Sequence, residues 1–316
     1  MEKNSKIFIA GPKGLVGSAI IRLLEKKEFS NLLTPSHLEL ELMDNQAVSR
    51  YFKKNKPEYV FLAAAKVGGI LANNTYPADF IYQNLMIQNN IIHQSYAHNI
   101  KKLLFLGSSC IYPKHCPQPM KEEYLMTGPL EPTNSPYAIA KIAGIEMCWS
   151  YNRQYGTKFI PVMPTNLYGP NDNFDLETSH VLPALIRKFH EAIQNNDESI
   201  VVWGTGSPKR EFLHVDDLAE ACLVIMQKKF SVQEYKNKPL FNIGSGKDIS
   251  IKELAELIKE ITGFKGKIVF DTSIPDGTPQ KLLDISKLKT LNFCAATTLK
   301  DGISGTYSAF QKTHSS

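Results

Sequence analysis

Several residues between positions 103 and 141 have the types and the spacing needed to reduce a carbonyl group. The apolar run 103–106 predicts a buried strand, and Ser108 follows where that strand ends. Open parallel sheets bind their ligands at the carboxyl ends of strands. Tyr137 and Lys141 lie four residues apart in a predicted helix that opens near Asn134, so they share one face of it. This set predicts the reduction of a ketone by a hydride donor.

Each of the three side chains has a role in that chemistry. The Ser108 hydroxyl can hydrogen-bond a carbonyl oxygen while the Tyr137 phenol protonates it. A Lys141 ammonium near the phenol would lower the pKa of the tyrosine and make it usable near neutral pH. Tyr-x-x-x-Lys is a weak pattern by itself, but among the 13 tyrosines only Tyr137 has a lysine at the fourth following position. An ordinary pair on a helix surface is the alternative.

A glycine-rich loop near the start of the chain predicts a dinucleotide site. It follows a short apolar strand at residues 7–10 and precedes a helix expected to run to about Lys26. Gly11, Gly14 and Gly17 permit a tight turn, close approach of a pyrophosphate and close packing of the helix on the strand. The phosphates would lie at the helix N-terminus, where free N–H groups and the dipole favour anions. Alternatively, the glycines serve only the connection between strand and helix.

The end of the second predicted strand, near residues 32–34, indicates which dinucleotide is bound. An acidic residue there would bind the ribose hydroxyls and repel a 2′-phosphate, but residues 35–37 are proline, serine and histidine. Lys13 in the glycine loop could meet a 2′-phosphate. These features favour NADPH over NADH. Asp44 follows at a helix start, where it is expected either to cap the helix or to reach the adenine.

Strands and helices alternate along the first 170 residues. Residues 59–65 and 159–163 predict further buried strands, and a long helix is expected from about Ala78 to His98. The alternation predicts an α/β fold with a Rossmann-like, doubly wound parallel sheet. The expected domains are a cofactor-binding domain, 1–170 plus about 211–245, and a smaller C-terminal α/β substrate domain, about 171–210 plus 246–316.

Composition excludes several classes of protein. Of the 316 residues, 43% are hydrophobic and 21% are charged, which is typical of a soluble protein with a sizeable core. The net charge of +5 is scattered, so nucleic acid is not an expected partner. We expect no metal site and no membrane span, because the sequence has neither a cluster of ligand residues nor a long apolar run. Five cysteines without a Cys-x-x-Cys pair predict reduced thiols in the cytoplasm.

The chain resembles the GDP-L-fucose synthase family, a group of extended short-chain dehydrogenases/reductases that act on GDP-4-keto-6-deoxy-D-mannose. The resemblance covers essentially the whole chain and is carried by these segments: 63–70, 107–114, 136–144, 164–170, 210–217 and 275–281. It implies inversion of the sugar at C3 and C5, then NADPH-dependent reduction of the C4 ketone to give GDP-L-fucose. The family usually has arginines at Lys13 and after the second strand, so this chain departs from it there.

The resemblance also assigns roles to individual residues. Cys110 would be the base and His180 the acid of the inversions, beside Ser108, Tyr137 and Lys141. A free thiol ionises near pH 8.5 and a free imidazole near pH 6.5, so both exchange protons close to neutrality. The implied cofactor contacts are Gly11, Pro12, Lys13, Gly14, Leu15, Val16, Gly17, Leu106, Gly107, Ser108, Ser109, Tyr137, Lys141, Pro164, Thr165, Asn166, Leu167 and His180. The implied contacts to the GDP-sugar are Lys188, Trp203, Arg210 and Asp276.

Other interpretations stay open at this point. Cys110 fits a small buried hydrophobic residue, His180 an ordinary residue at a helix end, and Arg210 a solvated surface charge. The whole chain could instead be another nucleotide-sugar epimerase or dehydratase, a GDP-L-colitose-type synthase, or a regulator that binds cofactor without catalysis. A 4-epimerase needs neither Cys110 nor His180, and a regulator needs no reducing set. The helices at about 78–98 and 137–155 are expected to form a homodimer interface.

Overall fold

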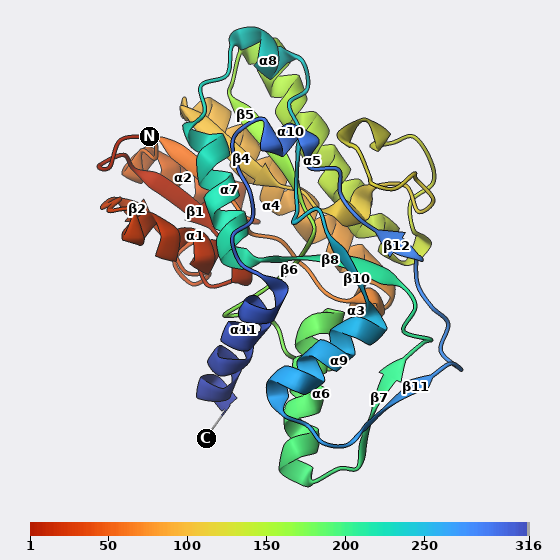
Figure 1. Cartoon of the computed structure of the whole chain (residues 1–316). Coiled ribbons are helices and arrows are strands. Elements are labelled where there is room, and N and C mark those ends of the chain that lie inside the picture. Colours follow the sequence, from red (N-terminus) through yellow and green to blue (C-terminus); the bar gives the residue numbers. More distant parts are fainter. Residues whose placement is uncertain (315–316) are drawn as a thin grey trace.

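The centre of the fold is a six-stranded sheet. The computed structural model describes residues 1–314, and Figure 1 shows its helices and strands. Across the sheet the strands are β2 (Leu32–Leu33), β1 (Ile7–Ala10), β3 (Tyr59–Leu62), β4 (Lys102–Leu106), β5 (Phe159–Pro164) and β9 (Phe241–Ile243). Every pairing in this sheet is parallel. The prediction of a Rossmann-like parallel sheet in an α/β fold is confirmed.

The order of the strands places a binding crevice beside β1. The chain passes from β1 to β2 on one side and then returns to β3 on the other. At such a reversal the connections leave in opposite directions, so a crevice opens beyond the carboxyl ends of the strands. The glycine loop, residues 11–17, follows β1 and leads into α1 (Leu15–Lys26) at this point.

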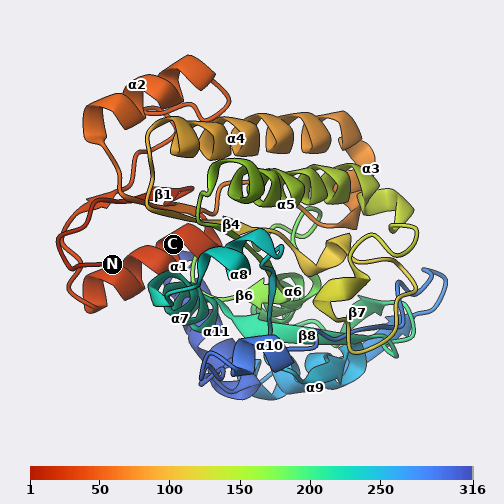
Figure 2. The same ribbon diagram turned by 90° about the horizontal axis from the view of Figure 1, so that it is seen from above.

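Helices cover both faces of the sheet, as Figure 2 shows. On one face lie α1 and α7 (Val215–Gln227), whose apolar side chains share a core with β1, β4 and β5. On the other face lie α2 (Asn45–Asn55), α4 (Pro77–Ala97) and α5 (Ser135–Tyr155). The sheet is therefore buried on both sides, which explains why its strands read as unbroken apolar runs in the sequence.

The second half of the chain builds a smaller α/β part with its own core. Its strands are β6 (Asn166–Tyr168), β7 (Ser199–Trp203), β8 (Lys209–His214), β10 (Asp248–Ser250), β11 (Lys267–Asp271) and β12 (Gln280–Lys281). Its main helices are α6 (Val181–Asn195), α9 (Ile251–Thr262) and α11 (Leu299–His314). Strand β8 pairs with β6, β10 and β12, while β7 pairs with β11. The third apolar cluster lies among these elements.

Short helices complete the connections. They are α3 (Ile70–Thr75), α8 (Val232–Lys236), α10 (Ser286–Lys289) and the 3₁₀ turns η1 (Ser109–Ile111), η2 (Glu122–Tyr124) and η3 (Pro132–Asn134). Two of the 3₁₀ turns, η1 and η3, flank the loop that joins β4 to α5. Ser108 and Cys110 lie at the start of this connection, and Tyr137 and Lys141 follow it in α5.

One buried carboxylate ties the smaller part to the larger one. Glu211 of β8 is fully buried, and its carboxylate accepts hydrogen bonds from the amides of Gly246 (2.6 Å) and Leu283 (2.9 Å). Its backbone carbonyl accepts from Thr165 Oγ1 (3.2 Å) and Asn166 Nδ2 (2.8 Å). Burial raises the pKa of Glu211, and these amide bonds oppose that rise. The carboxylate thereby fixes the segment after β12 beside β8.

Several predictions of local structure are settled by these elements. Asp44 caps α2, because its Oδ1 accepts hydrogen bonds from the amides of Gln46 (2.8 Å) and Ala47 (3.0 Å). Helix α7 and strand β9 return the chain to the six-stranded sheet, where β9 pairs with β5. All five cysteines are free thiols. Within residues 1–314, no helix combines the length and the apolar character that crossing a membrane requires.

Candidate active site

Strand β4 delivers Ser108 and Cys110 to the carboxyl edge of the sheet. After Gly107 the chain tightens into η1, and Ser108 Oγ accepts a hydrogen bond from the Cys110 amide (3.3 Å). This turn brings the two side chains together, with Ser108 Oγ 2.9 Å from Cys110 Sγ. Both residues are half-buried. A hydroxyl that can hold a carbonyl oxygen therefore lies beside a thiol that can exchange a proton.

Helix α5 brings Tyr137 and Lys141 against the same strand end. Its Gly144 packs directly on β4, since a Cβ there would lie 2.5 Å from the ring of Phe105. Lys141 is buried, and its Nζ donates a hydrogen bond to the carbonyl of Leu106 (2.8 Å) at the end of β4. Burial lowers the pKa of Lys141 to about 8, and the negative charge of Cys110 opposes that fall.

The expected lowering of the Tyr137 pKa is not what the structure shows. Tyr137 is only 8% exposed, and burial raises the pKa of its phenol; a negative charge on Cys110 raises it further. A hydrogen bond with Ser108 acts in the opposite direction. The Lys141 amine is 5.8 Å from the centre of the Tyr137 ring and is bonded to a backbone carbonyl. The phenol is therefore held protonated, ready to donate a proton, and spacing along a helix could not reveal this burial.

His180 enters the site from the loop before α6. It is the N-cap residue of that helix, and its side chain is exposed. The preceding loop is attached to the segment after β3, because the Gly69 amide donates to the carbonyl of Thr178 (2.8 Å). Loss of hydration beside the surrounding protein lowers the pKa of His180, and the positive charge of Lys281 lowers it further. Protonated His180 is therefore a stronger acid than a free imidazolium ion.

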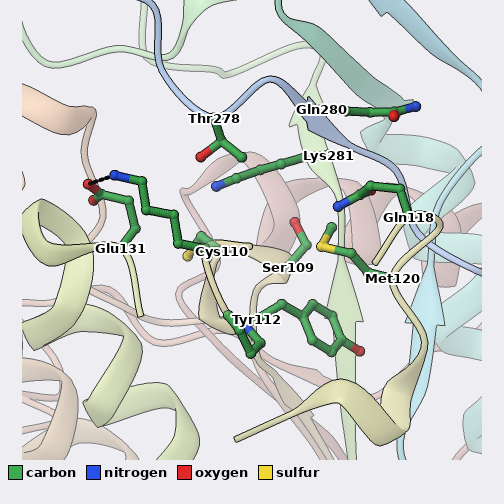
Figure 3. A pocket seen from close by; sticks show the side chains of 11 residues that line it. Ser109, Cys110, Tyr112, Gln118, Met120, Glu131, Thr278, Gln280 and Lys281 are labelled. Carbon is green, nitrogen blue, oxygen red and sulfur yellow. Dashed lines mark ion pairs between the residues drawn. The ribbon is translucent and has the colours of Figure 1, made fainter. Parts of the chain in front are cut away.

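A pocket opens beside Cys110, between the loop after β4 and the segment around β12 (Figure 3). It is lined by Ser109, Cys110, Tyr112, Pro113, Lys114, Gln118, Met120, Glu131, Thr278, Gln280 and Lys281. Lys114 pairs with Glu131 across 3.9 Å. The lining is rich in charged and amide side chains, so it suits a ligand with hydroxyl or carbonyl groups.

The four residues predicted to meet the GDP-sugar lie around the ends of β7 and β8. Lys188 Nζ is 5.0 Å from the centre of the Trp203 ring, and Trp203 is 59% exposed. Asp276 accepts hydrogen bonds from the amide of Thr205 (2.9 Å) and from its hydroxyl (2.6 Å). Burial lowers the pKa of Arg210, while Asp276 raises it. An exposed indole with two cations nearby can accept a flat base or sugar and a diphosphate.

The glycine loop has the geometry of a phosphate cradle. Gly11 has φ +83°, which favours glycine, and a Cβ on Gly17 would lie 1.9 Å from the carbonyl oxygen of Gly11. The loop therefore folds back tightly against the first turn of α1. Gly14 is the N-cap of that helix and offers no side-chain cap, so the first amides are left for a ligand.

Beside this loop, the region after β2 carries two acidic side chains that sequence reasoning did not weigh, Glu39 and Glu41. Glu39 turns back to accept hydrogen bonds from the amide (2.7 Å) and hydroxyl (2.8 Å) of Ser36. These bonds chiefly lower the pKa of Glu39, and Lys13 contributes to the lowering. His37 pairs with Glu41 (3.0 Å). Lys13 therefore has a carboxylate within electrostatic range, which reduces the positive potential available to a 2′-phosphate.

Comparison with known proteins identifies the family. The model of the "NAD dependent epimerase/dehydratase family" matches residues 7–244, the part that holds the glycine loop, β4 and α5. The chain belongs to this family. It is 60% identical over 307 residues to "Putative GDP-L-fucose synthase 2" of Arabidopsis thaliana, covering 97% of this chain and 92% of that protein. It is 54% identical over 310 residues to "GDP-L-fucose synthase" of Escherichia coli (strain K12), covering 97% of each.

A solved structure of similar sequence supports the same grouping. "MlghC, GDP-mannoheptose C4 reductase from Campylobacter jejuni with NADP bound" superimposes with a TM-score of 0.91 at 46% identity. The match covers 98% of this chain and 99% of that chain. The chain is thus similar in sequence and fold to a protein described as a GDP-mannoheptose C4 reductase.

The predicted site residues of this family member form two groups. Ser108, Cys110, Tyr137 and Lys141 meet at the end of β4, as described above. Lys188, Trp203, Arg210 and Asp276 gather at the smaller part of the fold. Within residues 1–314, His180 has no hydrogen bond to either group, so its role stays a prediction. Sequence reasoning missed Lys281, although it ends the segment 275–281 that resembles the fucose synthases.

Proposed function

We propose that this protein is a bifunctional epimerase-reductase that converts GDP-4-keto-6-deoxy-D-mannose to GDP-L-fucose with NADPH. The observation that carries the proposal is the 2.9 Å approach of Cys110 Sγ to Ser108 Oγ. A plain ketone reductase needs a carbonyl-holding hydroxyl and a proton donor, but it has no use for a thiol at that position. The names of the relatives at 54–60% identity support the same substrate.

The inversion uses protons next to the ketone. The C–H bonds at C3 and C5 flank the C4 carbonyl, so loss of either proton leaves an enolate whose charge lies on the carbonyl oxygen. Cys110 takes the proton, the electron pair moves toward that oxygen, and Ser108 and Tyr137 stabilise it by hydrogen bonds. His180 returns a proton to carbon from the opposite face, which inverts the centre.

Reduction then uses the same oxygen contacts. Bound NADPH supplies a hydride for C4. Tyr137 gives its proton to the oxygen as the alcohol forms, while Ser108 keeps that oxygen in place. Lys141 fixes the end of β4 through its bond to Leu106. The raised pKa of Tyr137 keeps the phenol protonated until the alkoxide forms and accepts the proton.

Residues 11–17 at the carboxyl edge of the sheet would hold the phosphates of NADPH, and Tyr137 would contact its nicotinamide. Residues 106–109 and 164–167 begin at the last residues of β4 and β5 on the same edge, which supports their predicted contacts with the cofactor. The GDP half of the substrate would lie on Lys188, Trp203, Arg210 and Asp276. The division into a cofactor domain and a substrate domain at the boundaries given above is part of this proposal.

The product identifies the reaction. Purified protein is incubated with GDP-4-keto-6-deoxy-D-mannose and NADPH, and the product sugar is analysed by NMR. We expect the L-galacto configuration of fucose. A product that keeps the original configuration at C3 and C5 would make the protein a plain C4 reductase. No NADPH oxidation with this substrate, together with turnover of a GDP-3,6-dideoxy or GDP-heptose ketone, would favour another member of the family.

NADPH is expected to give a higher kcat/KM than NADH, with Lys13 contributing. Lys13 is an exposed cation in the glycine loop, and no carboxylate directly follows β2. Lys13→Gln is expected to reduce the NADPH-to-NADH ratio roughly tenfold, because a charge-assisted phosphate contact is lost. Lys26→Gln, at the far end of α1, serves as the matched control. An equal or better kcat/KM with NADH in the unmodified protein would overturn the assignment.

We also propose that the protein is a cytoplasmic homodimer formed through α4 and α5. These helices pack side by side on one face of the sheet (Figure 2) and expose Tyr82 (61%) and Ile139 (47%). Light scattering after gel filtration should give about two chain masses, and the double variant Tyr82→Glu/Ile139→Glu about one. Val232→Glu, which changes an exposed residue of α8, should stay dimeric. A monomeric unmodified protein would contradict this interface. The free cysteines support the proposed cytoplasmic location, because thiols stay reduced in the cytoplasm.

A further inference from the structure

The amine of Lys281 lies in the pocket beside Cys110, and among the described residues it has no hydrogen-bond or ion-pair partner. Lys281 ends β12, where it is in register with Arg210 of β8. Figure 3 shows its side chain crossing the pocket, with the amino group on the side of Cys110 and Glu131. The residue is half-buried. Its backbone is held in place because Glu211 binds the amide of Leu283, two residues further along.

The other two lysines near Cys110 are engaged. Lys141 donates to the carbonyl of Leu106, and Lys114 pairs with Glu131. In the part of the chain that the structure describes, the side-chain amine of Lys281 has neither a hydrogen bond nor an ion pair. The backbone of Lys281 is fixed in β12 and its side chain is half-buried. The positive charge of its ammonium group therefore lies in the pocket that contains the Cys110 thiol.

We propose that Lys281 is the cation that stabilises the thiolate of Cys110 when this thiol acts as the base of the two inversions. The inference rests on the proposed function for the role of Cys110. Lys281 acts through Cys110 and not on the substrate, so it is a positioning residue.

The charges around Lys281 agree with that role. Burial lowers the pKa of Lys281, and a negative charge on Cys110 is the largest influence that raises it again. Arg210 lowers the Lys281 pKa, while Glu131 and Cys116 raise it. An attraction between two charges is mutual, so the ammonium favours the thiolate as the thiolate favours the ammonium. Lys281 also lowers the pKa of His180, which makes protonated His180 a better donor.

Lys281 neither gains nor loses a proton in these steps, and the proton transfers balance without it. The thiolate of Cys110 forms an S–H bond as the substrate C–H bond breaks, and the electron pair of that bond becomes the enolate. Lys281 keeps its three protons throughout. The ammonium lowers the free energy of the Cys110 thiolate before the substrate is deprotonated. It also repels the positive charge of protonated His180.

Alkylation of Cys110 at different pH values tests the pairing without any substrate. Iodoacetamide reacts with the thiolate, and mass spectrometry of the Cys110 peptide reports this cysteine separately from the other four. Lys281→Met and Lys281→Gln should move the midpoint of alkylation up by about one pH unit, a tenfold smaller thiolate fraction. Lys281→Arg should keep the midpoint, and Lys114→Gln, which removes a cation already paired with Glu131, should hardly move it.

Exchange of the sugar hydrogens gives the second readout. At saturating substrate and pH 7, both neutral variants should exchange C3 and C5 hydrogens about tenfold more slowly, and the loss should diminish as pH rises. An unmoved alkylation midpoint in both neutral variants would overturn the proposal. So would a raised KM with unchanged saturated exchange, because Lys281 would then bind the diphosphate. A moved midpoint, with no exchange of this sugar even by the unmodified protein, supports the pairing and contradicts the proposed function instead.

Discussion

Replacing Cys110 by serine is expected to abolish exchange of the C3 and C5 hydrogens with solvent. A serine hydroxyl ionises far above the pH at which thiols do, so it cannot supply a base near neutrality. We expect a loss on the order of 10²- to 10⁴-fold, the usual range for removing a general base. The measurement is deuterium incorporation from D₂O into GDP-4-keto-6-deoxy-D-mannose, followed by NMR without NADPH. The carbonyl contacts remain, so the variant should still reduce the uninverted ketone slowly.

Two further variants are compared with Cys110→Ser. Cys116→Ser should exchange at the unmodified rate, because Cys116 is another half-buried free thiol near the pocket but does not line it. His180→Asn should impair inversion, since a proton must be returned from the opposite face. If Cys110→Ser exchanges both hydrogens as fast as the unmodified protein, the thiol is structural and another base performs the inversion.

Tyr137→Phe is expected to bind NADPH normally while losing ketone reduction by a factor on the order of 10² or more. The phenol is buried beside Ser108 and is the proposed proton donor, and its raised pKa keeps the proton on it at neutral pH. Steady-state oxidation of NADPH with the GDP-4-keto sugar measures the loss, and fluorescence titration measures cofactor binding. The ring packs edge-on against Phe80 at 6.3 Å, so phenylalanine keeps that contact.

A tyrosine on the same helix provides the control. Tyr151 lies further along α5, and its hydroxyl bonds His93 Nδ1 (2.8 Å) away from the strand end. Tyr151→Phe should leave turnover close to that of the unmodified protein. Near-normal NADPH oxidation by Tyr137→Phe would assign proton donation to a different group.

Local patterns predicted most of the large sheet and the positions of several candidate site residues in the fold. Apolar runs that end in small residues predicted β1 and β4. Strands buried on both faces have continuous apolar sequences and do not alternate with polar residues. Glycine spacing located the cradle because backbone crowding at Gly17 admits no side chain. The four-residue spacing of Tyr137 and Lys141 located one face of α5. Each of these signals is contained in a short stretch of sequence.

Two features depended on distant parts of the chain and were not predictable in that way. The pKa of Tyr137 is governed by burial between α5, the turn η1 and Phe80, and spacing within a helix gives no measure of burial. Lys281 lines the pocket beside Cys110 because β12 pairs with β8 and because Glu211 accepts a hydrogen bond from the amide of Leu283. A two-residue strand with a polar sequence has no periodicity from which that register follows.

The central claim is that one site performs both inversion and reduction, and the most direct test is a single reaction in D₂O with unlabelled NADPH. The GDP-sugar product is isolated and its hydrogen content at each carbon is read by NMR. We predict deuterium at both C3 and C5, protium at C4 from the hydride, and the configuration of L-fucose. A reduced product that carries protium at C3 and C5 would contradict the account, because reduction would then proceed without the inversion assigned to Cys110.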